Sequence, residues 1–317
     1  MNERTATPVS IFVLTGNEEL NIERCLASVS GWCSDIHVVD SNSTDRTIEI
    51  AKRFTDSIID HPYVDHASQL KWAFDNLPFK HDWVLFLDAD NVVTEKLKGL
   101  ISDTLMKDDG TVNGYYCLHH EIFRDRPIKG MKKWWARLVR RTHAAIDNSE
   151  LVDYGIKIEG KVGYLKGAIV EDNLKENDID FWIDKHQRFA RRMAAEEVLR
   201  KHKFIKWEVA PKLFGTSDER RVWLKNVWLE LPLFLRPFIY WLYRYIPSGA
   251  FLQGVHGLTF TLFQALWFRL VCDFKIQEFE RKIAKGELSP EMLWQEFGAK
   301  SLERDIVGRR DPNAGKF

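Results

Sequence analysis

Short apolar runs alternate with helical patterns through the first ninety residues. Runs with the length and composition of buried strands are VSIFVL at 9–14, DIHVVD at 35–40, SIID at 57–60 and DWVLFLDAD at 82–90. Apolar residues recur at helical spacing in the segments 17–32, 44–54 and 67–77 between them. This alternation predicts an α/β fold with an open, mostly parallel sheet that is covered by helices on both faces.

Polar residues end three of these strands, at 15–17, 40–42 and 88–90. Because ligands of such sheets bind beyond the carboxyl ends of the strands, we expect the three segments to meet at one rim. Asp88 and Asp90 are two carboxylates one residue apart, a hard-oxygen pair that suits Mg²⁺ or Mn²⁺ together with water and phosphate oxygens. The alternative is a pair of solvated turn acids.

The pattern changes in the later parts of the chain. Strand-like segments at 114–123 and 157–172 predict a β-rich second half of the same domain, and a long helix is expected over 178–202. We place this domain at residues 1–215, followed by hydrophobic and amphipathic helices at 216–280 and a polar tail at 281–317.

The segment 222–274 is dense in Trp, Phe, Tyr and Leu with arginines between them. Prolines at 232, 237 and 247 interrupt its first half, and the run from 249 to 272 contains Gln253, His256, Gln264 and Arg269. Aromatic helices with interspersed arginines suit the headgroup boundary, so we predict helices that lie in the plane of a membrane surface. A spanning helix and a buried helical subdomain are the alternatives.

Charge is balanced overall but unevenly distributed. The chain has 46 basic and 46 acidic residues, yet 8 Lys/Arg face 1 acid between 123 and 143, and 14 face 6 acids between 185 and 247. These basic stretches predict contact with an acceptor phosphate or with anionic lipid, or a solvated face. No nucleic-acid partner is expected, because the net charge is zero and no groove-reading motif is present. Four scattered cysteines and the absence of a signal-peptide pattern predict a reduced, cytosolic setting.

Three ordered motifs resemble glycosyltransferase family 2, whose fold is called GT-A. They are VLTGNEELNIERCLASV, HVVDSNSTDRTIEIAKRF and WVLFLDADNVV, within residues 9–93. The later segments ARLVRR, EGKVGYLKG and WIDKHQRFARRMAAEE are similar to the branch that contains bacterial lipopolysaccharide-core and exopolysaccharide glycosyltransferases. The resemblance extends to about residue 280 and includes a membrane-docking tail.

The resemblance implies a nucleotide-sugar donor and a role for each matching residue. Asp40 would lie beside the nucleoside, and Asp88 and Asp90 would hold the metal, with Asp90 the more direct ligand. Other matching positions would line the donor pocket or contact the diphosphate or acceptor: Thr15, Asn17, Glu18, Lys71, Arg137, Arg140 and Arg141. Ser43 and Asp45 would shape the turn after the second strand or cap the next helix.

The family uses a carboxylate from the second half of the domain as general base in an inverting transfer. This chain departs from its relatives there, since it reads NSELVDYGIKIEG where they tend to show a His-Glu pair. Asp153 is the first candidate, Glu150 the second, and Asp172 in the segment VED the third.

The resemblance implies transfer of a sugar from a nucleotide-sugar to a lipid-linked glycan or a lipopolysaccharide-core acceptor. A UDP-sugar is the expected donor, because UDP is the commonest donor nucleotide in the family. The enzyme would lie at the cytoplasmic face of the bacterial inner membrane as a peripheral or monotopic protein, bound to anionic lipid. Transfer onto polyprenyl phosphate is an alternative. A catalytically silent membrane scaffold with the same fold is the alternative from a different class.

Overall fold

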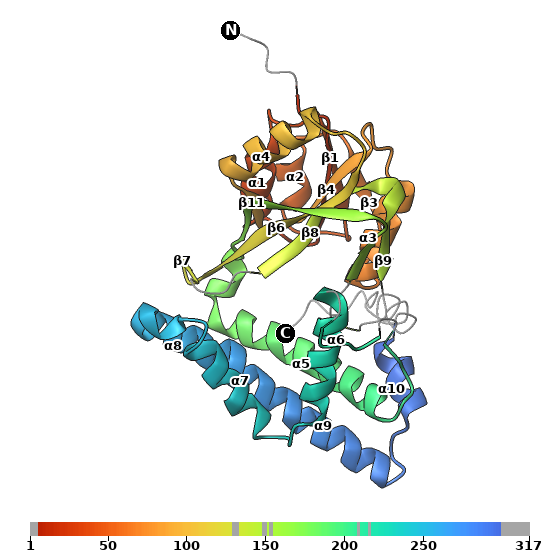
Figure 1. Ribbon diagram of the computed structural model, residues 1–317, viewed down its shortest axis with the longest axis vertical. Helices are drawn as coiled ribbons and strands as arrows, with labels where there is room; N and C mark the ends of the chain where they lie inside the picture. Colours follow the sequence, from red (N-terminus) through yellow and green to blue (C-terminus); the bar gives the residue numbers. More distant parts are fainter. Residues whose placement is uncertain are drawn as a thin grey trace. The chain divides into compact units, whose positions relative to one another are not determined.

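The computed structural model describes residues 6–128, 133–147, 151, 155–207, 210–214 and 217–298 (Figure 1). The chain divides into two compact units. The first contains residues 1–147 and 155–179, and the second contains residues 148–154 and 180–317.

A mixed sheet forms the centre of the first unit, with strand order β3-β2-β1-β4-β8-β6-β11-β5 and β7 paired to β6. Its strands are β1 (Ser10–Thr15), β2 (Asp35–Asp40), β3 (Ile58–Asp60), β4 (Trp83–Asp88), β5 (Asn91–Val93), β6 (Val112–Phe123), β7 (Arg126–Pro127), β8 (Lys133–Arg140) and β11 (Lys161–Glu171). β1 pairs in parallel with β2 and β4, β2 pairs in parallel with β3, and β6 pairs in parallel with β11. β8 runs antiparallel between β4 and β6. The mostly parallel sheet of the prediction is confirmed.

Helices cover both faces of this sheet, and alternate residues of β1 show why the strand is apolar throughout. Ile11 and Val13 belong to a core that also contains buried residues of α1 (Ile22–Val29), α2 (Thr47–Ala51) and α4 (Glu95–Met106). Phe12 points the other way and packs against Phe74 of α3 (His66–Asn76), with ring centroids 5.4 Å apart. A strand that is buried on both sides has no polar face, and this accounts for the continuous apolar run.

The second half of the first unit extends the sheet as predicted. β6 and β11 are long; β6 lies between β8 and β11 (Figure 1). A separate two-stranded ribbon consists of β9 (Ala144–Asp147) and β10 (Gly155–Ile158).

The second unit is helical in its described part. Its helices are α5 (Ile179–Lys201, which begins at the boundary), α6 (Ser217–Glu230), α7 (Arg236–Tyr245), α8 (Gly254–Thr261), α9 (Phe268–Ala284) and α10 (Pro290–Phe297). Small residues on α5, Ala194 and Ala195, let it pack closely on α9 and α10, where Ile276, Phe279 and Leu293 are buried. Arg236 of α7 is buried against Asp273 of α9, with its Nε 2.8 Å from Oδ1.

The compact units differ in extent from the predicted domains. α5, which the prediction includes in the domain 1–215, packs with α9 and α10, and the first compact unit ends at Ile179. α10, in the expected polar tail, buries Leu293 and Phe297 and belongs to the core of the helical unit.

The run Ala250–Ala284 is the one helical stretch in the described residues that is long and apolar enough to cross a membrane by length and composition. One third of its apolar window is buried inside the protein. Asp273 lies in this run and is fully buried in an ion pair.

Candidate active site

The carboxyl ends of β1, β2 and β4 meet at one rim of the sheet. The parallel register sets Thr15 opposite Asp40 and Leu14 opposite Asp88. Each strand ends there because its apolar run gives way to residues that prefer turns or carry charge. The rim therefore brings Thr15, Asp40 and Asp88 together, as the pattern of strand ends predicts.

A hydrogen-bonded turn fixes the Asp40 carboxylate at this rim. Asp40 is buried, and it accepts bonds from the backbone N–H of Ser43 (2.8 Å) and from the Ser43 hydroxyl (2.5 Å). The Ser43 Oγ in turn accepts from the backbone N–H of Asn17, 2.7 Å away. Asn17 has φ of 56°, a left-handed conformation that Asn tolerates well, and its side chain accepts from Thr44 N–H at 2.8 Å. The loops after β1 and β2 are thus tied into one rigid unit.

A cavity of about 570 Å³ lies beside this turn. Residues of β2, β3 and α2 and of the turn line it: Asp40, Asn42, Ser43, Thr44, Ile48, Lys52, Ile58 and Asp60. The Thr15 hydroxyl is buried at the same rim and has no hydrogen-bond partner among the described residues. Such a buried orphan group is costly unless a ligand satisfies it, so the rim has the character of a binding site.

Asp45 caps the start of α2 instead of facing the cavity. Its carboxylate accepts from the backbone N–H of Thr47 at 3.0 Å. Burial opposes ionisation, but the hydroxyl and N–H of Thr47 lower the pKa of Asp45 below its ordinary value. The Asp45 carboxylate also accepts from the backbone N–H of Glu19 at 3.1 Å, so it holds the turn before α2 against the loop after β1.

Asp88 is held by a buried arginine. The Arg137 guanidinium is only 2% exposed and lies 3.0 Å from Asp88 Oδ2, while His66 Nε2 lies 3.4 Å from Asp88 Oδ1. Burial of Asp88 favours the neutral acid, but the charges of Arg137 and His66 hold its pKa below the ordinary value. Asp88 is therefore an ionised residue whose charge the protein itself already balances.

Two side-chain amide groups orient the Asp90 carboxylate. Its Oδ1 accepts from Asn91 (2.8 Å) and its Oδ2 accepts from Asn173 (3.1 Å). Within the described residues, no group of three His, Cys, Asp or Glu side chains converges as a closed metal cage. An open site fits Mg²⁺ or Mn²⁺, because these ions retain water and take phosphate oxygens beside one or two carboxylates.

The end of β11 closes the rim from the other side. Asp172 donates its backbone N–H to the carbonyl of Asp90 (3.0 Å), and its carboxylate pairs with Arg24 of α1. The Asn173 side chain donates to the Asp90 carboxylate and accepts from the Asn21 amide. Lys175 donates to the backbone carbonyl of Asn17 at 3.2 Å and forms an ion pair with Glu18. Asp172 and Glu18 thus belong to the assembled rim.

Glu171 and His119 form a second polar pair beside Asp172. His119 Nε2 lies 2.8 Å from Glu171 Oε2, and the imidazole stacks on Trp135 with centroids 3.9 Å apart. Burial, followed by the charges of Lys133 and Arg137, lowers the pKa of His119 to about 3. The imidazole is therefore neutral at pH 7.

Three predicted contacts are not brought to the rim. Arg140 and Arg141 follow Arg137 along β8, which runs antiparallel to β4, so Arg140 lies opposite Trp83. Five residues of strand, roughly 16 Å, separate that position from Asp88. Arg140 pairs there with Asp82 (2.6 Å) and with Asp108, and Arg141 stacks over Phe79.

Lys71 lies on an exposed side of α3 and pairs with Asp75 at 2.6 Å. Gln69, two residues earlier, is buried and bonds the Ser41 hydroxyl at 2.9 Å. Gln69 therefore reaches the rim loop, where Lys71 was expected.

The candidate bases Glu150 and Asp153 lie outside the described residues. Sequence reasoning also missed five polar residues of the rim: Arg24, His119, Glu171, Asn173 and Lys175. Arg24 lies inside the first motif and Glu171 inside VED, so only these two carried a signal.

Comparison with known proteins places this site in a family. The model for "Glycosyl transferase family 2" matches residues 10–166. An uncharacterized glycosyltransferase of Rickettsia bellii is 34% identical over 98 residues, which cover 31% of this chain and 33% of the relative. A lipopolysaccharide core biosynthesis glycosyltransferase, LpsC, of Rhizobium meliloti is 27% identical over 186 residues, 54% of this chain and 68% of the relative. The chain spans about a third of the length of the first relatives that it matches.

Among solved structures, glucosyl-3-phosphoglycerate synthase from Mycobacterium tuberculosis, in complex with Mg²⁺ and uridine diphosphate, is 19% identical, with a TM-score of 0.30 over 36% of this chain and 44% of that chain. The family model covers β1 to β8, the first residues of β11, and both aspartates of the strand end. Residues 10–166 therefore form a glycosyltransferase domain of glycosyl transferase family 2.

Proposed function

We propose that this chain transfers a sugar from a nucleotide-sugar, with a UDP-sugar as the first donor to test, to a lipid-linked glycan or lipopolysaccharide-core acceptor, with inversion. The observation that carries the proposal is the single rim that holds both the Asp40 turn and the Asp88–Asp90 segment. LpsC, by its name, acts in lipopolysaccharide core biosynthesis, and this supports the acceptor class.

The donor's nucleoside would lie against Asp40 in the cavity beside Ser43 and Thr44. A volume of about 570 Å³ is within the range of small-ligand sites. Asp40 can accept from a base N–H or a ribose hydroxyl, since Ser43 already holds its carboxylate in place. The buried Thr15 hydroxyl offers a further hydrogen bond to the donor.

Asp90 would be the direct protein ligand of Mg²⁺ or Mn²⁺, with the diphosphate supplying further oxygens. Asp88 is engaged by Arg137 and would serve the donor's ribose or the metal's water shell. When bound, the cation supplies neutralisation of the charge that grows on the departing nucleoside diphosphate. Asn91 and Asn173 keep the Asp90 oxygens oriented for that role.

The general base would be one of Asp153, Glu150 and Asp172. Asp172 is the candidate within the described residues, and its backbone is bonded to that of Asp90. An acceptor assay on Asp153→Asn, Glu150→Gln and Asp172→Asn decides among them. The base variant is expected to lose transfer but to retain slow donor hydrolysis, because the base acts on the bound acceptor hydroxyl while the groups that hold the donor stay intact.

Slow hydrolysis of UDP-, GDP- and dTDP-sugars with Mn²⁺ or Mg²⁺ tests the donor half of the proposal. We expect metal-dependent release of one nucleotide, and a loss of at least 100-fold in Asp90→Asn, in line with removal of a preorganised charge contact. Asp75→Asn is the matched control, since Asp75 is an exposed acid that pairs with Lys71. If no nucleotide binds in the presence of metal, the enzyme assignment of this chain fails and the silent-scaffold alternative replaces it.

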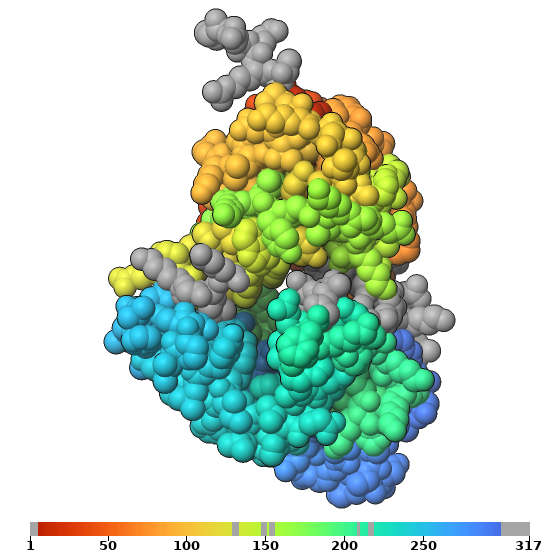
Figure 2. Space-filling view, viewed as in Figure 1, coloured from red at the N-terminus to blue at the C-terminus, as the bar shows by residue number. Residues whose placement is uncertain are grey.

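The helical unit would attach the enzyme to the cytoplasmic face of the inner membrane through α7 and α8. Figure 2 shows the surface that these helices form, in light blue. Large apolar side chains on it are 45–79% exposed: Phe238, Ile239, Leu242, Tyr243, Ile246, Phe251, Leu252 and Val255. The buried Asp273–Arg236 pair favours an in-plane surface over a spanning α9, because a span would place this pair at membrane depth.

Vesicle sedimentation tests this surface. Inserting one such side chain contributes about 1.5–3 kcal/mol, so Leu242→Glu with Val255→Glu is expected to weaken binding to phosphatidylglycerol-containing vesicles by more than 100-fold. Met106→Glu, a matched change at a 71% exposed residue of α4, should leave binding unchanged. Equal binding by both variants would remove α7 and α8 from the membrane contact.

A further inference from the structure

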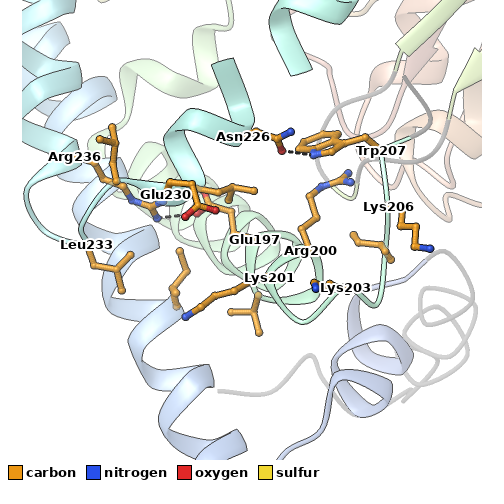
Figure 3. Close-up of a pocket in the computed structure, with 15 residues that line it drawn as sticks. Glu197, Arg200, Lys201, Lys203, Lys206, Trp207, Asn226, Glu230, Leu233 and Arg236 are labelled. Carbon is orange, nitrogen blue, oxygen red and sulfur yellow. Dashed lines mark hydrogen bonds and ion pairs between the residues drawn. The ribbon is translucent and has the colours of Figure 1, made fainter. Parts of the chain in front are cut away.

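The helical unit contains a second cavity, of about 520 Å³, that the donor chemistry does not use. It lies between the end of α5, the turn after it, α6, the loop to α7, and α9 (Figure 3). Aliphatic side chains form much of its wall: Val198, Ile205, Leu229, Leu231, Leu233 and Ile276.

Cations outnumber acids among the residues that line this cavity. Three of the five are already matched by carboxylates: Arg236 by Glu197 (2.7 Å), Arg200 by Glu196 (2.9 Å) and Lys201 by Glu280 (3.0 Å). The other two, Lys203 and Lys206, are exposed and make no ion pair with any described carboxylate. Glu230 also lines the cavity, and Asp273 is a second carboxylate on Arg236, so charge is balanced over the whole surroundings. Lys203 and Lys206 are the lining cations that remain for a ligand above the apolar wall.

One wall is rigid before any ligand arrives. The Trp207 indole donates to Asn226 Oδ1 at 2.6 Å, and the Arg200 guanidinium lies 3.5 Å from the centre of its ring. Figure 3 shows Trp207, Asn226 and Arg200 grouped on one side of the cavity. Because these side chains are already fixed, a ligand loses little affinity to ordering them.

We propose that this cavity binds an anionic amphiphile, a phosphate monoester that carries an aliphatic chain. Lys203 and Lys206 would hold the phosphate, and the aliphatic side chains of the wall would contact the first carbons of the chain. Each buried methylene tightens binding by about fourfold, so the wall favours a lipid phosphate strongly over a free phosphate. The loop between α6 and α7 runs from Leu233 in the lining to Leu235, which is 53% exposed, and on to the apolar surface of α7. A lipid chain could leave the cavity along this apolar path.

The probe is farnesyl phosphate at concentrations below micelle formation, titrated calorimetrically into the full chain without nucleotide or metal. Farnesol, inorganic phosphate and isopentenyl phosphate are the comparison arms, since they remove the charge, the whole chain and most of the chain in turn. We expect farnesyl phosphate to bind at least tenfold more tightly than each of them. Because no donor is present, the result does not depend on the nucleotide assay, and either can fail alone.

Charge variants locate the site. Lys203→Gln with Lys206→Gln removes two cations and is expected to weaken farnesyl phosphate binding roughly 25-fold, at about fivefold per charge. Lys203→Arg with Lys206→Arg should retain binding, which guards against loss by misfolding. Lys282→Gln with Lys285→Gln is the matched control, because these lysines pair with Glu278 and Glu287 and do not line the cavity.

Three results would overturn the proposal. The first is absence of farnesyl phosphate binding, and the second is equal weakening by the two Gln double variants, which would indicate only nonspecific charge attraction. The third is inorganic phosphate binding as tightly as farnesyl phosphate, which would leave an anion site without a lipid.

Discussion

The Arg137–Asp88 pair gives a quantitative test of how the rim is held together. Arg137 is 2% exposed, contacts the Asp88 carboxylate at 3.0 Å, and lies over the rings of Phe86 and Trp135 at 5.0 and 4.9 Å. Arg137→Met keeps an unbranched stem between those rings and removes the charge. Asp88→Asn removes the opposing charge and keeps the shape of the carboxylate.

The expected cost follows from burial. Removing one partner of a buried ion pair typically destabilises by about 3–5 kcal/mol, because the other charge stays desolvated. Asp88 is 29% exposed in its side chain, so water offsets part of that cost and about 2–3 kcal/mol is expected for Arg137→Met. The double variant leaves no orphan charge, and its cost should be close to that of one single change. The coupling energy is therefore about 2 kcal/mol.

Native-state hydrogen exchange of β4 and β8 amides, in metal-free buffer, measures this coupling. It reports local opening, which suits a chain of two compact units better than one global unfolding midpoint. If the effects of the two single changes add to within about 0.5 kcal/mol, Arg137 does not compensate Asp88 and the charge balance described for the rim is incorrect.

Three other predictions test the placement of rim residues. Burial lowers the folded-state pKa of His119 to about 3, whereas the unfolded chain protonates this residue near pH 6.5. As the pH falls between these two values, the free energy of unfolding therefore decreases by up to about 1.4 kcal/mol per pH unit. His119→Phe, which keeps the stack on Trp135, should flatten that slope in urea unfolding at pH 7 and pH 5, whereas an unchanged slope would assign it to other groups. Gln69→Leu removes the hydrogen bonds that Gln69 makes to the Ser41 hydroxyl and to the His61 imidazole, and we expect it to weaken UDP binding roughly tenfold. Lys71→Gln should weaken it less than twofold, and calorimetry measures both. Arg140→Met should lower the free energy of unfolding by about 1 kcal/mol, measured by thermal unfolding, because Arg140 pairs with partly exposed acids at the far end of β8. UDP binding should stay unchanged, and a loss of binding would contradict this placement of Arg140.

The sequence identified the strand ends because burial on both faces leaves a continuous apolar run that polar residues terminate abruptly. Thr15, Asp40 and Asp88 follow such runs, and the parallel register brings them together. The order β1, β2, β3 and β4 alternating with helices was predictable for the same reason.

The sequence did not show which of several neighbouring side chains in a helix or strand faces the rim. Gln69 and Lys71 are two residues apart on α3, which is roughly 200° around a helix, so only one of them can face the rim. Arg137 and Arg140 are three residues apart on β8, which places them on opposite faces and roughly 10 Å apart along the strand. Composition showed a basic, aromatic segment, but the choice among its arginines required the antiparallel register to β4.

The remaining rim contacts join segments that are far apart in the chain. Arg24 meets Asp172 across 148 residues, and Asn173 meets Asp90 across 83. No local pattern encodes such a pair, since either partner alone has the features of a surface residue. The packing of α5 was inaccessible for a related reason, because the sequence of a helix does not show which other helices it packs against.

These long-range contacts separate the roles of the two aspartates of the strand end. Arg137 neutralises Asp88 from within the protein, so an added cation gains little there. Asp90 accepts from the side-chain amides of Asn91 and Asn173, which orient its oxygens. Because Arg137 already engages Asp88, we expect the loss of metal-dependent hydrolysis to be larger in Asp90→Asn than in Asp88→Asn.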